Sequence, residues 1–567
     1  MHVPTLLGLD IGTLGVKGVV VTADGRVLAR ARRGHGISQP RPGWAEQDAD
    51  DQWWGNGAAV IRELLAAAGV DPASIAAVGV CGLTPCLCLL DRDGRPLRPA
   101  ILYSDNRALA ELAQVNAALG AALTAQAITP KWTWLAEHEP DLVRGARCVL
   151  SSHNYVIYRL TGLASMDCDT ASIVGGVFDA QRKAWDAAAC AALGLDVGLL
   201  PPLRAATDVV GGVTEAAARA TGLRPGTPVI AGTGDTFPTI VGCGAVGPGD
   251  AMISFGTTGL LTLTTRPLEM AAAGPHFGAD ADGGAVTWAA NVLTCGRLVT
   301  WFQEEFGAAA AIPNVARSVG ILSGVPAVFG PERSRRMPKR SQQGRILRLR
   351  PAKGAGLRSG CSVTFGIPGA AVGADGRPPP PTLPDPAYLD RCAAAIPAGS
   401  EGLVALPHLM GRRTPMPDPH ARGVLFGLTP GHTAGHVYRA LLESFGYAVR
   451  QGYEPIRPWV RRLIATAGGA ASPLWRQIVA DILGAPIEHH AQASCSLGIA
   501  FLAAYATGQV SNFAAIRDAW LAGPEITTPD PGTRRIYDDL YRLYCHLDSS
   551  LATAFAMLPA AVGVDGR

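Results

Sequence analysis

The 567-residue chain lacks a dominant charge, because 49 lysines and arginines are balanced by 46 aspartates and glutamates. This balance argues against binding of the whole molecule to nucleic acid or to a membrane surface. Aromatic residues are also scarce, at 6% of the chain. Alanine, valine, leucine and glycine must therefore do most of the packing, and the length predicts two large lobes rather than one core.

The twelve cysteines include no Cys-x-x-Cys pair, which argues against a zinc or redox motif. Cys86 and Cys88 alternate within an expected strand, where buried free thiols are the simpler interpretation. The chain enters a strand pattern at once, without the basic and then apolar start of a signal peptide, and no apolar run reaches the roughly 20 residues of a membrane helix. We therefore expect a cytoplasmic, reduced protein with no membrane partner.

Charge is uneven in one place. Residues 331–360 hold ten lysines or arginines and one acid, so the net charge of this window is +9. Because the formal net charge of the whole chain is +3, the rest of the chain carries a net charge of −6. Around it, residues 314–383 show no helical or strand period. We expect a disordered, basic insertion there. A docking patch for RNA or an acidic partner is disfavoured, because no aromatic residue alternates with the arginines; an error in the gene boundaries stays open as a third explanation.

The first thirty residues predict an antiparallel meander. Strand patterns cover 6–9, 16–22 and 27–31, separated by a glycine-rich bend and an Asp24-Gly25 turn. A helix over 48–68 and a buried strand over 75–80 follow, and this alternation is typical of an α/β protein.

A second strand-rich block begins at Pro228 and contains another strand–bend–strand unit. The two units suggest an internal duplication of architecture. Gly247-Pro248-Gly249, inside this block, is interpreted as a boundary between lobes. Further helices are expected over 433–453, 474–483 and 496–506.

The first motif with chemical content is Asp-Ile-Gly-Thr-Leu-Gly-Val-Lys, from Asp10 to Lys17. Gly12 and Gly15 let backbone N–H groups turn toward a phosphate, and the Thr13 hydroxyl can add a donor. Asp10, at the end of a strand, can hold a hydrated magnesium ion. The bend differs from a Walker loop, which lacks this aspartate and leads from a strand into a helix. An ordinary glycine-containing hairpin is the alternative for this motif alone.

A second motif runs from Ala231 to Thr236 and again follows a buried strand. An acid among glycines has little bulk around it, so a substrate hydroxyl can approach within hydrogen-bond distance. Asp235 is therefore the candidate general base. An aspartate that caps the next helix is the alternative.

Two further glycine-rich bends complete the set. The stretch 254–259, Ser-Phe-Gly-Thr-Thr-Gly, mirrors the first bend, and 467–475 places a glycine pair between a strand and a helix, where a flat purine can lie against backbone. Each bend alone is weak evidence for nucleotide binding, since glycine pairs are common at such junctions. Their order along the chain carries the argument.

Together these motifs resemble the FGGY carbohydrate kinase family, and within it the xylulokinases. The similarity covers nearly the whole chain except the expected insertion. Residues 89–102, which contain Asp-Arg-Asp-Gly-Arg-Pro-Leu, match strongly. Residues 415–428, which contain Arg-Gly-Val-Leu-Phe-Gly-Leu, are like the family's C-terminal signature, and this match is quite specific.

The resemblance implies an α/β protein with two ribonuclease-H-like domains, as in actin-like ATPases, flanking a nucleotide cleft. The N-terminal lobe, 1–246, would bind sugar and phosphate and carry the base, and the C-terminal lobe, 247–567, would bind ATP. The implied activity is an ATP- and Mg²⁺-dependent transfer of the γ-phosphate to a hydroxyl of a small sugar. A ketopentose such as xylulose is the default substrate.

The resemblance also assigns roles to residues. Asp235 would accept the proton of the attacking hydroxyl, and Asp10 and Asp235 would hold the metal. The ATP-binding positions would be Gly12, Thr13, Gly15, Lys17, Gly256, Thr257, Thr258, Gly468, Gly469 and Ala470. The sugar-binding positions would be Thr84, Asp105, Asp235 and Thr236.

Two sugar-side positions depart from the xylulokinase pattern. Xylulokinases typically continue with Met-His-Gly after the strand that ends here at Val80, whereas this chain has Cys-Gly-Leu-Thr-Pro-Cys and no such histidine. The residue after the catalytic aspartate is commonly Asn and is here Thr236. We expect a retained reaction with an altered substrate, so another polyol, ketose or sugar acid stays open, as does an impaired nucleotide-binding protein.

Some candidates are weighed more evenly. Trp44, Asp105 and Asn106 suit either a sugar pocket or a packing role. His153 and Asn154 resemble a family helix start, so capping is preferred for both. A small-molecule sugar is the expected partner and nucleic acid is not; a homodimer is left open.

Overall fold

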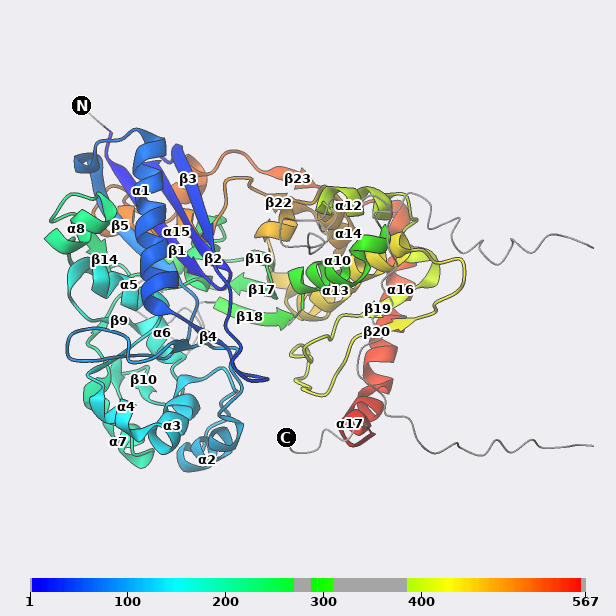
Figure 1. Ribbon diagram of the computed structural model, residues 1–567. Helices are drawn as coiled ribbons and strands as arrows, with labels where there is room; N and C mark the ends of the chain where they lie inside the picture. The colour runs from blue at the N-terminus through cyan, green and yellow to red at the C-terminus, as the bar shows by residue number, and fades with distance from the viewer. Residues whose placement is uncertain (1–2, 270–286, 293, 311–384, 562–567) are drawn as a thin grey trace, which may run out of the picture.

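The computed structural model of the chain describes residues 3–269, 287–292, 294–310 and 385–561. Within these parts the molecule consists of two lobes side by side, each built on its own sheet (Figure 1). The predicted insertion at 314–383, with its basic window, lies outside the described residues.

The first sheet has the strand order β13-β14-β5-β1-β2-β3, with β15 also pairing with β5. Neighbouring strands β1, β2 and β3 are antiparallel, whereas β1, β5 and β14 are parallel. The predicted N-terminal meander is thereby confirmed. The strands span β1 (Thr5–Gly12), β2 (Gly15–Thr22), β3 (Val27–Gly34), β5 (Ile75–Gly82), β13 (Val209–Gly212), β14 (Pro228–Ile230) and β15 (Thr233–Gly234).

The second sheet repeats this pattern in the order β18-β17-β16-β21-β22-β23. Its first three strands along the chain are antiparallel neighbours, and β16, β21 and β22 are parallel. The predicted duplication of architecture is therefore confirmed. The strands span β16 (Asp250–Phe255), β17 (Gly259–Thr264), β18 (Thr287–Val292), β21 (Arg462–Thr466), β22 (Ile487–His489) and β23 (Glu525–Thr527).

Alternation along β1 sorts its side chains between two faces of the first sheet. Leu7, Leu9 and Ile11 share a buried core with helices α1 (Asn56–Ala68) and α5 (Ser152–Thr161). Leu6 lies in a different core, together with residues of α15 (Cys495–Ala506). Asp10 has the same parity as Leu6, so its side chain emerges on the α15 face.

Glycines on that face let α15 lie directly against the sheet. A methyl group on Gly8 would stand 2.0 Å from the carbonyl oxygen of Ser496, and one on Gly79 would stand 2.4 Å from that of Ile499. Neither separation is compatible with a real side chain, so the helix and the two strands are in backbone contact. In Figure 1, α15 (orange) lies behind β1, although it comes from the C-terminal part of the chain.

The core around α15 joins the two lobes. It contains Leu6 and Ala77 of the first sheet, Met252 and Ile464 of the second, and residues of α9 (Thr236–Gly242). Apolar residues surround α15 on all sides, as expected for a helix buried between layers. The predicted lobe boundary at residue 247 falls between β15 and β16, and α15 crosses back over it.

The second sheet packs against a separate helical layer. The predicted helices of the C-terminal part are confirmed as α13 (Ala434–Ile456), α14 (Pro473–Leu483) and α15. Of these, α13 and α14 pack on the second sheet together with α10 (Gly296–Ala310), α12 (Pro386–Ala394) and α16 (Arg534–Ser550), whereas α15 belongs to the core that joins the lobes. A buried ion pair between Arg439 and Glu443 at 2.9 Å lies within this layer.

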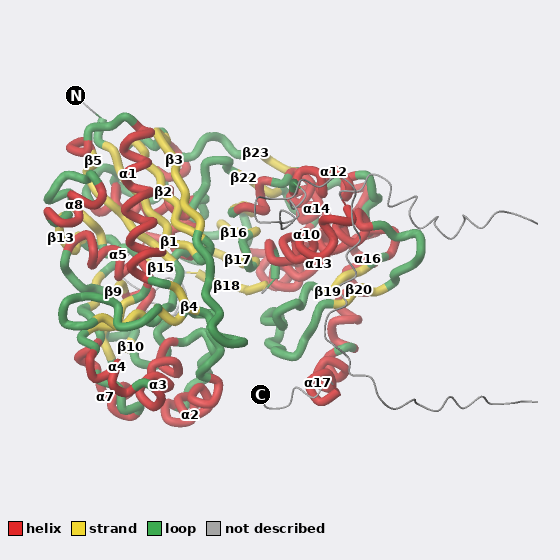
Figure 2. Tube along the Cα trace, in the orientation of Figure 1, coloured by secondary structure: helices red, strands yellow, loops and turns green. Residues whose placement is uncertain are grey.

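The lower part of the first lobe is mainly helical, as the tube in Figure 2 shows. It includes α2 (Leu109–Leu119), α3 (Ile128–His138), α4 (Pro140–Gly145) and α7 (Ala187–Ala192). The remaining α-helices of the described chain, in either lobe, are α6 (Cys168–Ser172), α8 (Glu215–Thr221) and α17 (Ala552–Ala561). The remaining strands form short two-stranded pairs: β4 (Glu46–Gln47) with β7 (Ala100–Ile101), β6 (Cys88–Leu90) with β8 (Cys148–Leu150), β9 (Met166–Asp167) with β12 (Leu203–Arg204), β10 (Phe178–Asp179) with β11 (Ala184–Trp185), and β19 (Val404–Leu406) with β20 (Val424–Phe426). No helix in the described parts of the chain is both long and apolar enough to cross a lipid bilayer.

Candidate active site

Asp10 and Asp235 lie at one edge of the first sheet. Asp10 on β1 is paired in register with Cys81 on the parallel strand β5, and Gly82 is paired with Gly234 on β15. The backbone N–H of Asp235 donates to the carbonyl of Gly82 at 3.0 Å. Because the carboxyl ends of parallel strands meet at the same edge, both carboxyl groups emerge beside each other.

The two carboxyl groups influence each other's ionisation. Burial and the nearby charge of Asp10 together raise the pKa of Asp235 to about 7. Burial also raises the pKa of Asp10, against the opposing charge of Lys17 on β2. Asp235 keeps partial contact with solvent, whereas Asp10 is 7% exposed. A carboxyl group that titrates near neutral pH can exchange a proton with a substrate hydroxyl.

The same pair suits a hard cation. Two carboxylates in a poorly hydrated recess repel each other, and a magnesium ion would relieve that repulsion through the oxygen ligands it prefers. Burial raises the pKa of both carboxyl groups, and the charge of Asp10 raises the pKa of Asp235 further. The donor set therefore fits Mg²⁺, with Asp10 and Asp235 as the residues that would hold it.

The first phosphate-type bend joins β1 to β2. Gly15 adopts a φ of 151°, and a methyl group there would stand 2.4 Å from the Arg33 carbonyl oxygen. The bend is held from outside, since Gln47 Nε2 donates to the Thr13 carbonyl at 2.8 Å and His35 Nε2 lies 2.9 Å from the Gly12 carbonyl. The carbonyl groups of Gly12 and Thr13 are therefore directed toward protein side chains.

The second bend joins β16 to β17 and exposes its threonines. Thr257 and Thr258 are exposed, while Gly256 accepts a hydrogen bond of 2.7 Å from the N–H of Gly296 at the start of α10. Ser254 on β16 is paired in register with Thr466 on β21. The bend and the loop that follows β21 are therefore neighbours at one edge of the second sheet.

The loop after β21 is the predicted adenosine-binding segment. A methyl group on Gly468 would meet nothing within 4 Å, whereas one on Gly469 would stand 2.6 Å from the Trp475 ring. The helix that follows is capped by Ser472, whose hydroxyl accepts from the Trp475 N–H at 3.0 Å. Gly468 thus presents bare backbone to open space, which suits a flat ring.

Three of the predicted sugar-side residues come together. The Thr236 hydroxyl lies 3.4 Å from Asp235 Oδ1. A methyl group on Gly234 would stand 2.5 Å from the Thr84 hydroxyl, so Thr84 packs directly over the residue that precedes Asp235. Two hydroxyl groups therefore flank the candidate base.

Asp105 is engaged elsewhere. Its carboxylate accepts from the Ala45 N–H at 2.6 Å and from Arg107 Nε at 2.9 Å, and its side chain is fully buried. Trp44 stacks over the Arg107 guanidinium at 3.7 Å. The structure thus gives Trp44 and Asp105 packing partners, and sugar binding by Asp105 stays a prediction.

The capping prediction for His153 and Asn154 is wrong. The residue at the N-cap of α5 is Ser151, and both candidates lie inside the helix. His153 Nε2 instead lies 2.9 Å from Asp167 Oδ2, with both side chains buried. The local sequence correctly indicated a helix start, but it could not reveal that the partner of His153 is Asp167 on strand β9.

Sequence reasoning also missed residues at this site. Arg413, from the C-terminal part of the chain, acts on Tyr103 of the first lobe: burial raises the pKa of Tyr103, and a hydrogen bond with Thr13 and the charge of Arg413 oppose that rise. Cys81 and Cys495 lie beside Asp10. The register of β1 and β5 could have indicated Cys81, but only the packing of α15 reveals Cys495.

Comparison with known proteins finds relatives over most of the chain. Residues 5–242 match the model of the FGGY family of carbohydrate kinases, N-terminal domain, and residues 251–507 match that of the C-terminal domain. The chain is 25% identical over 553 residues to a xylulose kinase of Bacillus subtilis (95% of each chain) and 28% identical over 498 residues to one of Escherichia coli (85% of this chain, 86% of the relative). The crystal structure of xylulose kinase from Rhodospirillum rubrum superposes with a TM-score of 0.71 at 27% identity, covering 97% of this chain and all of that one.

Proposed function

Because this chain belongs to the FGGY family of carbohydrate kinases, and is therefore an ATP-dependent sugar kinase, we propose that its acceptor is a ketopentose such as xylulose. Xylulose kinases from several bacteria are similar to the chain over most of their length. The acceptor proposal depends on this similarity, whereas the phosphoryl-transfer mechanism depends on the placement of Asp10 and Asp235 at neighbouring strand ends, with the pKa of Asp235 raised to about 7.

In the proposed mechanism Asp235 is the general base. It accepts the proton of the sugar hydroxyl as the oxygen attacks the γ-phosphorus of ATP, and its pKa near neutral makes that acceptance efficient. The Thr236 hydroxyl, at 3.4 Å from the carboxylate, orients it. Positioning and electrostatic stabilisation provide most of the rate of such transfers.

The nucleotide occupies the edges of both sheets in this proposal. The exposed hydroxyls of Thr257 and Thr258 and the bend with Thr13 donate to phosphate oxygens, and bare backbone at Gly468 accommodates the purine. Asp10 and Asp235 would hold Mg²⁺. When bound, the ion offsets negative charge on the phosphate oxygens.

The residues around the base favour a kinase with a modified sugar side. The segment after Val80, which contains Thr84, lacks the histidine that xylulokinases typically carry there, and Thr236 stands where they commonly carry an asparagine. Short hydroxyls leave more room and one donor each. A second candidate function, phosphorylation of a bulkier ketose, polyol or sugar acid, rests on this difference.

The acceptor is tested by a coupled assay of ADP release with ketoses, aldoses, polyols and sugar acids. We expect a sugar-dependent rate with ketopentoses that is at least tenfold above the rates with the other classes. A preference for a polyol or a sugar acid would replace the proposed acceptor and keep the kinase mechanism. Sugar-dependent turnover that survives Asp235→Asn unchanged would remove the proposed base.

We also propose a cytoplasmic location. ATP, the donor of this family, is a cytoplasmic metabolite, and each cysteine in the described residues is a free thiol. Fractionation of cells that express the tagged full chain would test this location.

A further inference from the structure

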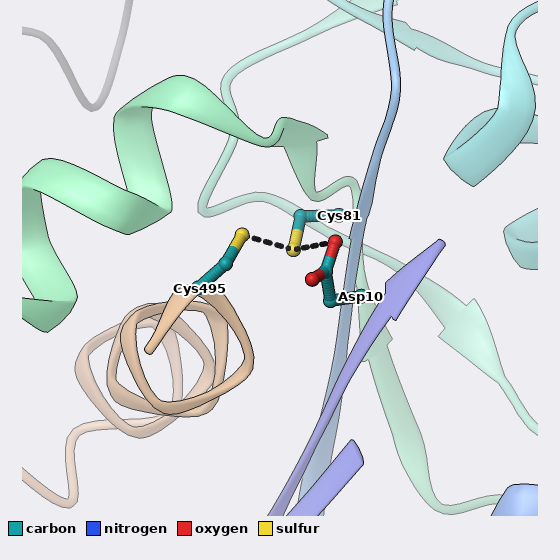
Figure 3. Close-up of side chains that lie close together, drawn as sticks. All are labelled: Asp10, Cys81 and Cys495. Carbon is teal, nitrogen blue, oxygen red and sulfur yellow. Dashed lines mark hydrogen bonds between the residues drawn. The ribbon is translucent and has the colours of Figure 1, made fainter. Parts of the chain in front are cut away.

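Asp10, one of the proposed catalytic pair, lies close to two further potential metal ligands, Cys81 and Cys495 (Figure 3). Cys81 Sγ lies 3.1 Å from Cys495 Sγ and 4.0 Å from Asp10 Oδ1. Asp10 and Cys81 are buried and Cys495 is half-buried. Two sulfur atoms and a carboxylate oxygen lie within 4.8 Å of one another, although the phosphoryl transfer proposed above uses only the carboxylate.

The fold fixes all three residues from the backbone. Asp10 and Cys81 are partners in register on β1 and β5, so their side chains leave the sheet on the same face, the face covered by α15. Cys495 is the first residue of α15, whose start is set by Ser494, the N-cap, accepting from the Leu497 N–H at 3.2 Å. Cys495 Sγ also donates to the Asp235 carbonyl at 3.3 Å.

We propose that Asp10, Cys81 and Cys495 form a binding site for a thiophilic divalent cation of the zinc class. A tetrahedral zinc ion, with bonds of about 2.3 Å to sulfur and about 2.1 Å to oxygen, separates its ligand atoms by roughly 3.6 to 3.8 Å. The sulfur pair at 3.1 Å would open slightly and the sulfur–oxygen pair at 4.0 Å would close slightly. Both changes are within side-chain rotation.

The ligand types distinguish this site from the magnesium site. Thiolates select zinc-class ions, whereas Mg²⁺ takes oxygen ligands and keeps several waters. Binding converts both thiols to thiolates, so two protons are released for each ion bound. The protein provides three ligands, and the fourth position is left to water or to a phosphate oxygen, as in open zinc sites.

Occupation of this site would inhibit the kinase. Asp10 cannot serve both ions, so a zinc-class ion withdraws it from the magnesium–nucleotide complex. The ion would also connect α15, from the C-terminal part of the chain, to β1 and β5. Inhibition rests on the proposed role of Asp10, but binding does not, so the two are measured separately.

Binding is tested with Co²⁺ as a coloured probe. The reduced full chain, kept in a phosphine reductant without nucleotide, is titrated with CoCl₂. We expect one ion per chain, release of two protons and a thiolate-to-cobalt charge-transfer band in the near ultraviolet. Cys81→Ala and Cys495→Ala should each weaken Co²⁺ binding at least tenfold and reduce the band by about half.

Cys243→Ala is the matched control. Cys243 is buried in the same core, but its thiol bonds to the Ile240 carbonyl. This variant should keep the wild-type band and affinity. A spectrum without the charge-transfer band, or a band that keeps its full wild-type intensity in both Cys81→Ala and Cys495→Ala, would overturn the site. Thermal unfolding of each variant without metal verifies that it is folded.

Inhibition is tested by adding Zn²⁺ to assays with saturating Mg²⁺ and ATP. Each variant is compared with its own metal-free rate. We expect Zn²⁺ to inhibit wild type and Cys243→Ala alike, and to inhibit Cys495→Ala at least tenfold less strongly. Equal inhibition of all three would overturn the inhibitory role. Co²⁺ binding without any sugar kinase activity would refute the proposed function and leave the metal site standing.

Discussion

The backbone N–H of Asp235 donates to the carbonyl of Gly82 at 3.0 Å and so ties the start of α9 to the end of β5. β5 is also the neighbour of β1, which carries Asp10. One strand thus sets the relative position of both carboxyl groups. Strand ends are rigid compared with loops, which is what a base and a metal ligand at one reaction centre need.

Replacement of the base should abolish transfer and spare nucleotide binding. Asp235→Asn keeps the shape of the side chain but cannot accept the proton, so we expect kcat for sugar-dependent ADP release to fall by about 10²- to 10⁴-fold. The Kd for ATP without magnesium should change less than threefold. Asp24→Asn, in the exposed turn at the other end of β2, is the control and should keep wild-type kcat. A loss of ATP affinity parallel to the loss of kcat would indicate misfolding instead.

The kinase should lose activity on the acid side of neutrality. Asp235 acts as a carboxylate, which in the metal-free site predominates above a pKa of about 7. Bound Mg²⁺ favours the carboxylate and moves this midpoint to lower pH. We therefore expect kcat/KM for the sugar to rise with pH on the acid side of about pH 7 and then to level off. A profile with no rise anywhere below about pH 7 would contradict the assignment of Asp235 as the titrating base.

The cause of that pKa can be tested without turnover. Infrared difference spectra of the magnesium-free protein should show a protonated carboxyl band that disappears near pH 7 and is missing in Asp235→Asn. Asp10→Asn removes a like charge that disfavours the carboxylate, so the band should disappear at a lower pH. If the pH at which the band disappears is the same in Asp10→Asn as in wild type, burial alone raises the pKa of Asp235.

Asp235 should also reduce stability at alkaline pH. A carboxyl group whose pKa is raised in the folded state favours folding less as pH rises from its unfolded value toward its folded value. Asp235→Asn has no such dependence, so it should gain roughly 1 to 3 kcal/mol over wild type at about pH 8 and little at about pH 4. Urea unfolding at both pH values provides the measurement, and an equal effect at the two would contradict the shifted pKa.

A side chain at Gly468 should interfere with ATP alone. The position faces open space, so Gly468→Leu is accommodated in the fold but covers the backbone proposed for the purine. We expect KM for ATP to rise about tenfold, with KM for the sugar changed less than twofold. Gly523→Leu, at another glycine that has nothing within 4 Å, is the control. Equal effects on both substrates would place the nucleotide elsewhere.

The backbone contact at Gly8 predicts a strong stability effect. A methyl group there would stand 2.0 Å from the Ser496 carbonyl oxygen, so Gly8→Ala must displace α15 from the first sheet. We expect a loss of about 2 to 3 kcal/mol or more in urea unfolding, as for other overpacked cores. Gly36→Ala has free space around it and should be within about 0.5 kcal/mol of wild type. A tolerated Gly8→Ala would mean that the helix sits farther from β1.

Much of the fold could be predicted from the sequence, because its main signals are local. The hairpin glycines before Val16 and after Asp24 placed the N-terminal meander, and apolar runs bounded by glycine placed the later strands. Asp10 and Asp235 were found for a similar reason, since Asp10 lies near the end of the buried strand β1 and Asp235 directly follows β15. The expected helices near the C-terminus also lie where predicted.

What the sequence could not provide depends on contacts between distant segments. Cys495 lies at Asp10 because α15 returns to the first sheet, and no local pattern near Ser494 signals that return. Asp105 resembled a sugar ligand in sequence, yet Arg107, two residues later, folds back to occupy its carboxylate. His153 finds Asp167 only through the packing of α5 against β9.

The return of α15 has a consequence for biosynthesis. One apolar face of the first sheet is covered by a helix that ends at Ala506, long after β15 has been made. While the ribosome is still translating the second half, the face of the nascent first sheet that carries Leu6 and Ala77 lacks the cover of α15. The two halves of this chain therefore cannot mature one after the other, and the N-terminal half synthesised alone would depend on chaperones to stay in solution.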